Sequence, residues 1–149
     1  MSRPETSDEE SLYERLGGSY AIAGAVDDIV DRLAHNETLN ENQGVRKFHE
    51  EAEMAGYKYH VTAWSIEATG GPAIYSARDM EEAHIDLGLT DREFDVTYRQ
   101  IEQSLNQLGV PEQETTEFMG IIEDYRDMVV DDREFDEAPP FVGQSGADD

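Results

Sequence analysis

Apolar residues recur at intervals of three and four along most of the chain, which is the spacing that places them on one face of an α-helix. No segment shows the alternation of a β-strand, and no internal repeat is present. The pattern predicts an all-α fold with one domain, over residues 11–132. Residues 1–10 and 133–149 are polar, acidic or rich in Gly, Pro and Ser, and we expect both to be flexible tails.

Glycine, proline and polar stretches divide this pattern into separate helices. Thr69-Gly70-Gly71-Pro72 ends one of them, because two glycines and a proline do not continue a helix. Thr90 and Glu93 have the spacing of a capping box and start another. We expect helices over about 11–16, 19–35, 53–68, 79–87, 90–108 and 111–130, with a polar connection at 36–44 and a short charged turn or helix around 45–51.

The charge of the chain narrows the choice of partners. Its 35 Asp and Glu residues outnumber its 11 Lys and Arg residues, which gives a net charge of −24 at pH 7. Nucleic acids and anionic membranes are themselves negative, so we expect neither as a partner. The acidic residues are spread over the helical pattern, which favours a folded domain with a hydrated surface over a disordered acidic protein. At 1 M salt the Debye length falls to about 3 Å, so the repulsion between these carboxylates is largely screened. We therefore interpret the chain as a halophilic type.

Cysteine is absent, which excludes disulfides, thiolate metal sites and a cysteine nucleophile. The first ten residues contain no apolar stretch typical of a signal peptide. No segment approaches the roughly 20 consecutive apolar residues of a membrane-spanning helix. We therefore expect a cytoplasmic protein.

Among the four histidines, His84 is the one on the apolar face of a short helix, between Met80 and Leu87. His35 and His49 lie among Asn, Glu and Lys, and we interpret them as solvated surface residues. From spacing alone, a hydrogen-bonded core or edge histidine is the more common explanation for His84, and a metal ligand is the alternative.

The spacing around His84 limits the metal chemistry that it can support. Glu81-x-x-His84 is half of a di-iron motif, but no second Glu-x-x-His exists in the chain. The HExxH zinc motif, the phosphate-binding P-loop and the GxSxG elbow are also absent. Haem iron needs only one histidine and apolar walls. The helix over 53–68 offers such a wall with Tyr57, His60, Val61 and Trp64, unless these are ordinary core residues.

A series of short motifs resembles the group I truncated haemoglobins over about residues 11–130. In chain order the motifs are LYERLGG, AVDD, ATGGP, Tyr75-x-x-Arg78-x-Met80-x-x-x-His84, Leu87-Gly88-Leu89-Thr90 and LGVP. Each motif alone is weak, whereas the full series in this order is fairly specific. The resemblance implies a truncated globin fold, a two-over-two helical sandwich that holds haem b between the helix over 53–68 and the helix of His84.

The resemblance also implies roles for single residues. His84 matches the proximal iron ligand, and His60 matches a position where some members carry a sixth ligand. Tyr75 and Arg78 match residues near the haem edge and propionates. The remaining matches to haem contacts are Met80 and Leu89 on the proximal side, Phe94 and Ile101 on the pocket floor, and Tyr57, Val61 and Trp64 on the distal helix.

The distal half departs from the family pattern. Ile29-Val30 stand where the family usually has Phe-Tyr, whose hydroxyl bonds the bound ligand. A polar stretch around Asn42-Gln43 replaces the usual Phe pair, and the loop Tyr-Thr-Gly-Arg reads Tyr75-Ser76-Ala77-Arg78. We expect Tyr57, or His60 from another angle, to supply the missing polar contact.

The implied function is reversible binding of O2 or NO at ferrous haem. NO detoxification is known in the family, and it would need an external reductase, because we find no reductase domain in this sequence. We expect a monomer or a weak dimer. Two alternatives stay open: an acidic helical interaction module without haem, and a haem-based redox enzyme or sensor that binds a partner through its acidic C-terminal tail.

Overall fold

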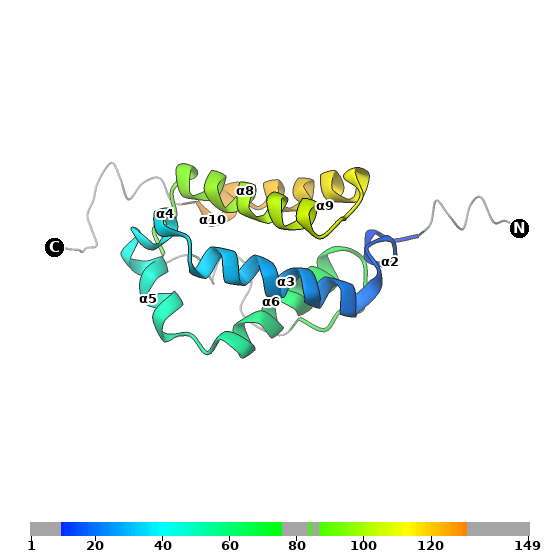
Figure 1. Cartoon of the computed structure of the whole chain (residues 1–149), viewed down its shortest axis with the longest axis horizontal. Helices are drawn as coiled ribbons and strands as arrows, with labels where there is room; N and C mark the ends of the chain where they lie inside the picture. The colour runs from blue at the N-terminus through cyan, green and yellow to red at the C-terminus, as the bar shows by residue number, and fades with distance from the viewer. Residues whose placement is uncertain (1–9, 76–83, 85–86, 131–149) are drawn as a thin grey trace, which may run out of the picture.

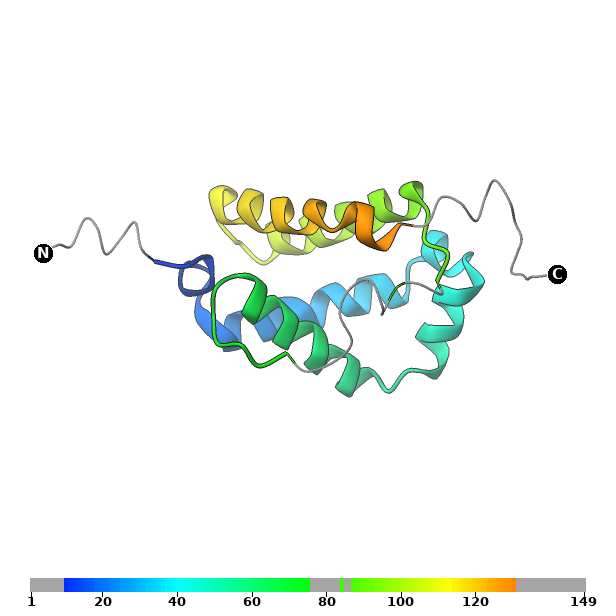
Figure 2. The ribbon, with the colours of Figure 1, turned by 180° about the vertical axis from the view of Figure 1, so that it is seen from behind.

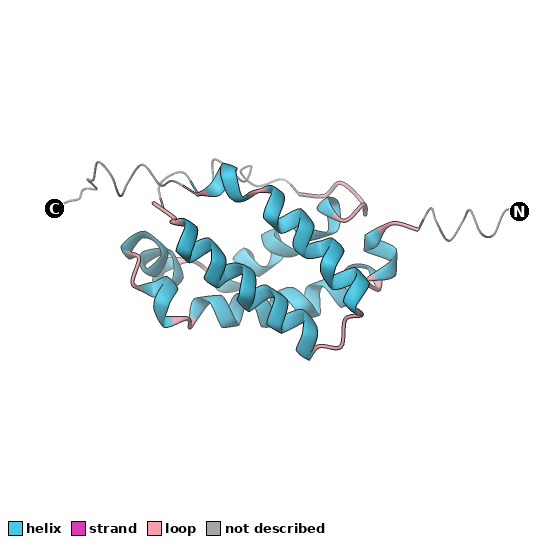
Figure 3. Ribbon diagram, turned by 90° about the horizontal axis from the view of Figure 1, so that it is seen from above, coloured by secondary structure: helices cyan, strands magenta, loops and turns pink. Residues whose placement is uncertain are grey.

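Helices are the regular elements in the part of the chain that the structure, a computed structural model, describes: residues 10–75, 84 and 87–130 (Figure 3). In chain order they are α2 (Leu12–Arg15), α3 (Gly18–Ala34), α4 (Glu37–Asn40), α5 (Gln43–Glu51), α6 (Met54–Ala68), α8 (Asp91–Gln107), α9 (Glu112–Asp124) and α10 (Arg126–Val129). The prediction of an all-α fold is confirmed. None of these described helices has both the length and the apolar character needed to cross a membrane.

The long helices form two layers (Figures 1 and 2). α3 and α6 lie in one layer, and α8 and α9 lie in the other. α3 packs against both α6 and α8, and α8 packs along α9. At one end of the sandwich α2 contacts α3 and α9, and at the other end α4 contacts α5 and α8. This is the two-over-two arrangement that the resemblance to truncated haemoglobins implies, and the expectation is confirmed.

Three clusters of buried apolar side chains hold the layers together. One joins α2 and α3 to α8 and α9, one lies between α3 and α6, and one joins α4 and α5 to α8 and α10. Their buried members are, in that order, Leu12, Ile29, Ile101, Leu105, Phe118 and Met119; Ile22, Val26, Val30 and Ile66; and Leu39, Val45, Leu89, Phe94 and Val129.

A capping box starts α8, as the sequence predicts. The Thr90 hydroxyl accepts a hydrogen bond from the Glu93 backbone N–H at 3.0 Å, and the Glu93 carboxylate accepts one from the Thr90 N–H at 3.0 Å. Both N–H groups would otherwise lack a partner at the helix end, so the pair fixes where the helix begins. The start of α8 is thereby fixed a short distance after His84.

The prediction of a polar connection over 36–44 is wrong. α4 and the start of α5 occupy this stretch, because two asparagine side chains cap them. Asn36 Oδ1 accepts from the Leu39 N–H at 3.0 Å, and Asn42 Oδ1 accepts from the Val45 N–H at 3.1 Å. The Leu39 side chain is 3% exposed, so the stretch also contributes to the core.

The predicted helix over 111–130 is interrupted at Tyr125. The backbone there has φ −93° and ψ −1°, and it separates α9 from α10. The Tyr125 ring meets Trp64 of α6 edge to face, with ring centroids 5.4 Å apart. The break therefore coincides with a contact between the two layers.

Candidate functional site

His84 lies in a helical conformation and is half-buried. Its backbone carbonyl accepts a hydrogen bond from the Leu87 N–H at 3.1 Å. Gly88 follows with φ +62°, a left-handed conformation that ends a helix and that glycine adopts without strain. Leu89 is buried beyond this turn, at 8% exposure. The imidazole is therefore carried by a helical turn whose end is well defined.

Arg78 and Met80, which the sequence analysis assigns to the haem edge and the proximal side, lie outside the described residues. Glu81, the partner in the half di-iron motif, also lies outside them. Their roles stay predictions.

Tyr57 lies on α6 with its ring edge-on to Phe48 of α5, at 4.7 Å between centroids and 75° between planes. Burial raises the pKa of the Tyr57 hydroxyl above its ordinary value, and Tyr75 nearby adds to the effect. The structure gives this hydroxyl no hydrogen bond to any residue in its described part. The Tyr57 side chain is partly buried against the cluster between α3 and α6, and its hydroxyl is not used in a hydrogen bond within the described residues.

The other α6 residues of the predicted distal wall are distributed around the helix. Val61 packs on the buried cluster between α3 and α6, and Trp64 contacts Tyr125. His60 is exposed, and its ring lies 5.7 Å from the neighbouring Tyr59 ring. A role of His60 as a sixth ligand stays a prediction.

Phe94 and Ile101 of α8 are buried, at 4% and 7% exposure, but in different clusters. Phe94 packs with Leu89, directly after the His84 turn. Ile101 packs farther along α8 against α2, α3 and α9. Of these two residues, Phe94 is therefore the one that shares a cluster with the segment following His84.

Two residues of α5 were not identified by the sequence analysis. Phe48 supplies the aromatic contact to Tyr57, and it comes from a segment interpreted only as charged. His49 is not a solvated surface residue as predicted, because it is partly buried and its Nδ1 lies 2.7 Å from Asn40 Oδ1. Burial, followed by the charge of His35, lowers the pKa of His49. The spacing of Val45, Phe48 and Ala52 on one helical face is the signal that could have shown the buried side of α5.

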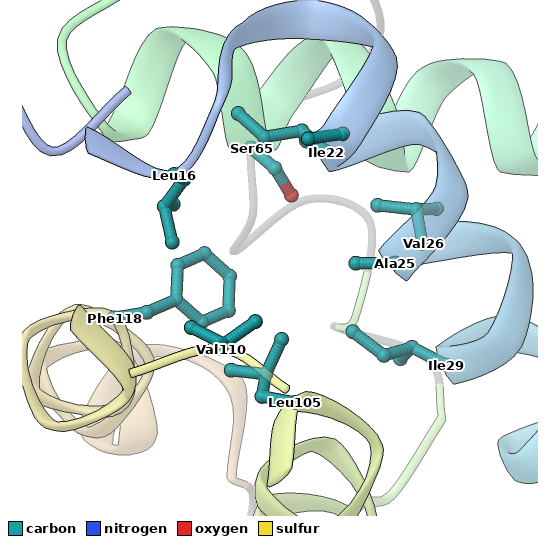
Figure 4. Close-up of a pocket in the computed structure, with 10 residues that line it drawn as sticks. Leu16, Ile22, Ala25, Val26, Ile29, Ser65, Leu105, Val110 and Phe118 are labelled. Atoms are coloured by element: carbon teal, nitrogen blue, oxygen red, sulfur yellow. The ribbon is translucent and has the colours of Figure 1, made fainter. Parts of the chain in front are cut away.

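A separate apolar cavity lies between α3, α8 and α9 (Figure 4). It has a volume of about 40 Å³ and is lined by side chains such as Ile22, Ile29, Leu105 and Phe118, with the Ser65 hydroxyl as a polar group. This volume suits a molecule the size of water and is far too small for a porphyrin.

The residues present fit a cofactor that brings its own metal. In the described part of the chain, no group of three or more His, Cys, Asp or Glu side chains is arranged to hold a bare metal ion. What the described residues provide is a half-buried histidine, a partly buried phenol without a hydrogen bond to another described residue, and buried apolar side chains such as Leu89 and Phe94. Haem needs one such histidine and apolar walls, and no further protein ligand.

The two-over-two helical sandwich is the fold of a truncated globin, and comparison with known proteins leads to the same class. The sequence model of the bacterial-like globin family matches residues 11–131, and the chain belongs to this family. Its curated relatives include the group 1 truncated hemoglobin GlbN of Synechocystis, 33% identical over 106 residues, 68% of this chain and 81% of that protein. The group 1 truncated hemoglobin of Tetrahymena pyriformis is 29% identical over 126 residues, 85% of this chain and 95% of that protein.

Solved structures agree with this membership. The Fe(III) form of truncated hemoglobin from Tetrahymena pyriformis superposes with a TM-score of 0.69 at 26% identity, over 81% of this chain and 98% of that one. The 2/2 hemoglobin of Synechococcus, solved in the cyanomet state with covalently attached heme, gives 0.69 at 30% identity with the same coverage. The chain is accordingly a haem-binding globin of the truncated, group I type.

Proposed function

We propose that the chain binds haem b through His84 and that it takes up O2 reversibly, with NO as a second ligand. When bound, haem would supply an iron that can take up a diatomic gas. The protein's task is to hold the imidazole, exclude bulk water and offer a hydrogen-bond donor to the ligand. The observation that carries the proposal is the half-buried His84 on a helical turn of a truncated globin fold.

Tyr57 is our candidate for the donor on the distal side. Its side chain is partly buried, its hydroxyl has no hydrogen bond to another described residue, and burial raises the pKa of this hydroxyl above its ordinary value. A phenol is protonated at neutral pH, so the Tyr57 hydroxyl would donate a hydrogen bond to a ligand held beside it. Ile29 and Val30 are both buried, at 6% and 2% exposure, and offer no such group.

The apolar contacts support the same arrangement. We propose that Leu89 and Phe94 line the proximal side, and that Val61 and Trp64 contribute the wall of α6. Tyr75, whose backbone N–H donates to Glu67 at 3.3 Å, is the last residue described before the segment that carries Arg78 and Met80. We assign Tyr75, Arg78 and Met80 to the edge and proximal face of the haem on the family pattern.

The test is spectroscopic. Recombinant full-length protein supplied with hemin should be red, and the reduced form should change its visible spectrum reversibly with O2. His84→Ala should lose most of the haem absorbance while keeping the helical circular dichroism. Protein that folds but stays colourless, or a His84→Ala variant with an unchanged spectrum, would contradict the proposal.

A further inference from the structure

The turn that follows His84 is tied to the start of α5 by the Asn42 side chain. Asn42 Nδ2 lies 3.2 Å from the Gly88 carbonyl oxygen and 2.9 Å from Glu93 Oε1, so the amide donates to both. The other end of the same side chain, Oδ1, accepts from the Val45 N–H and caps α5. One residue thus connects the beginning of α5, the end of the His84 turn and the beginning of α8.

The backbone at this junction is closely packed. A Cβ atom placed on Gly44 would lie 3.3 Å from both the Cα and the carbonyl oxygen of Leu87. The α5 backbone at Gly44 therefore packs directly against Leu87, whose N–H donates to the His84 carbonyl. Figure 2 shows the start of α5 beside the chain that leads into α8.

Asn42 also completes the hydrogen bonding of the α8 cap. Glu93 Oε1 accepts from both the Thr90 N–H and Asn42 Nδ2. Gly88, which has a positive φ, belongs to the same turn, and its carbonyl oxygen accepts a hydrogen bond from the Asn42 amide. Polar groups paired in this way fix the chain on both sides of the turn, because each would be left unsatisfied if the turn shifted.

We propose that Asn42 is a positioning residue for His84: it fixes the turn after the histidine and thereby the height and tilt of the imidazole toward the haem iron. The proposal rests on the proposed role of His84. Outer residues that orient a metal ligand commonly affect metal affinity without touching the metal.

Asn42→Ser is the test variant, and Asn36→Ser is its matched control. Serine is a good helix cap, so both variants keep a capping oxygen. Of these two asparagines, only Asn42 has a described hydrogen bond from its amide to the 87–93 segment. Both proteins are studied as the full chain loaded with haem, with circular dichroism as the measure of folding.

We expect Asn42→Ser to accelerate hydrogen exchange of the Leu87–Thr90 amides and transfer of haem to apomyoglobin by about threefold to tenfold. The iron–histidine stretching band of the reduced protein should shift or broaden in this variant. Asn36→Ser should leave all three measurements at the wild-type values. Equal behaviour of the two variants would overturn the proposal.

Two further measurements distinguish a failure of this proposal from a failure of the proposed function on which it rests. If Asn42→Ser does not fold, the wild-type exchange decides, because amides of Leu87 and Thr90 that exchange as fast as free peptide would overturn the anchoring. If His84→Ala keeps its haem, the proposed function fails, while the exchange of the 87–90 amides still reports whether Asn42 anchors the turn.

Discussion

The Phe48 ring stands edge-on to the Tyr57 ring, with 4.7 Å between their centroids and 75° between their planes. Phe48 belongs to α5 and Tyr57 to α6, so the contact holds the tyrosine from the side of the neighbouring helix. Edge-to-face pairs of this kind contribute about 0.5–1.5 kcal/mol beyond their buried area. The contact restricts the direction in which the Tyr57 hydroxyl can point.

The first prediction concerns this hydroxyl. Tyr57→Phe should increase the O2 dissociation rate by about tenfold, because a hydrogen bond of roughly 1.4 kcal/mol to the ligand is lost. Stopped-flow mixing of the O2-loaded protein with dithionite measures this rate. Tyr59→Phe is the matched control, since Tyr59 is 59% exposed on the same helix and should have the wild-type rate. An unchanged rate in Tyr57→Phe would remove this residue from the distal role.

The second prediction concerns Arg126, which joins α10 to α8. Its guanidinium lies 2.9 Å from Asp91, 2.7 Å from Asp95 and 2.6 Å from Glu123, and it stacks over Phe94 at 4.4 Å from the ring centroid. Arg126→Gln should lower the free energy of unfolding by about 1–2 kcal/mol, because part of the pairing and the ring contact are lost and three carboxylates remain close together.

Urea denaturation of the haem-loaded protein measures this loss. Arg126→Lys keeps the charge but not the planar fork, so its midpoint should fall between those of the wild type and Arg126→Gln. A glutamine variant as stable as the wild type would show that the exposed carboxylates are already well solvated.

The third prediction concerns pH. The pKa of His49 is held below its ordinary value by burial and by His35, while the unfolded chain titrates near about 6.5. Below that pH the unfolded state binds more protons than the folded state, so the free energy of unfolding falls as the pH falls. The stability that neutral His49 provides is complete above about pH 6.5 and is lost toward its lower, folded-state pKa.

His49→Gln separates this effect from the titration of the carboxylates. Glutamine keeps an N–H donor for Asn40 Oδ1 but has no charge to gain. Urea midpoints at pH 7.5 and pH 5.5 should therefore differ less for His49→Gln than for the wild type. Parallel pH dependence of the two proteins would assign the effect to other groups.

The fourth prediction concerns salt. With a net charge of −24, the folded chain repels itself, and added salt should raise the melting temperature. Screening changes most between about 0.01 and 0.15 M, where the Debye length falls from about 30 to 8 Å, so most of the gain should occur there. Calorimetry over a NaCl series measures it. A melting temperature that rises only above 1 M would point to ion exclusion in place of charge screening.

The sequence predicted the strongest local signal correctly, whereas two weaker helix caps and the contacts between distant segments were missed. The capping box of Thr90 and Glu93 involves four adjacent positions, so its spacing alone predicts it. α4 was missed because Asn36 and Asn42 read equally well as loop residues, and their role as caps depends on the burial of Leu39 by α8.

The candidate site shows the same difference between local signals and contacts across the fold. His84 stood out because it lies on an apolar face, whereas Phe48 lies between Lys47 and His49 and shows its function only through contact with α6. Asn42 looked like a departure from the family pattern. In the structure its amide reaches Gly88 and Glu93, which lie far along the chain, and a single sequence contains no signal of that pairing.

Because a few basic residues form ion pairs between helices, we expect substitutions at different surface positions to differ in their effect on stability. Arg15 pairs with Glu114 and Glu117 across α2 and α9, and Lys58 pairs with Asp27 and Asp31 across α6 and α3. A further acidic substitution elsewhere on the surface adds a little to a repulsion that solvent and salt already screen. Loss of Arg15 removes the cation that pairs with Glu114 and Glu117 of α9. Loss of Lys58 removes the cation that pairs with Asp27 and Asp31 of α3. Random exchange of surface charges should therefore be tolerated at most acidic positions and poorly at these few basic ones.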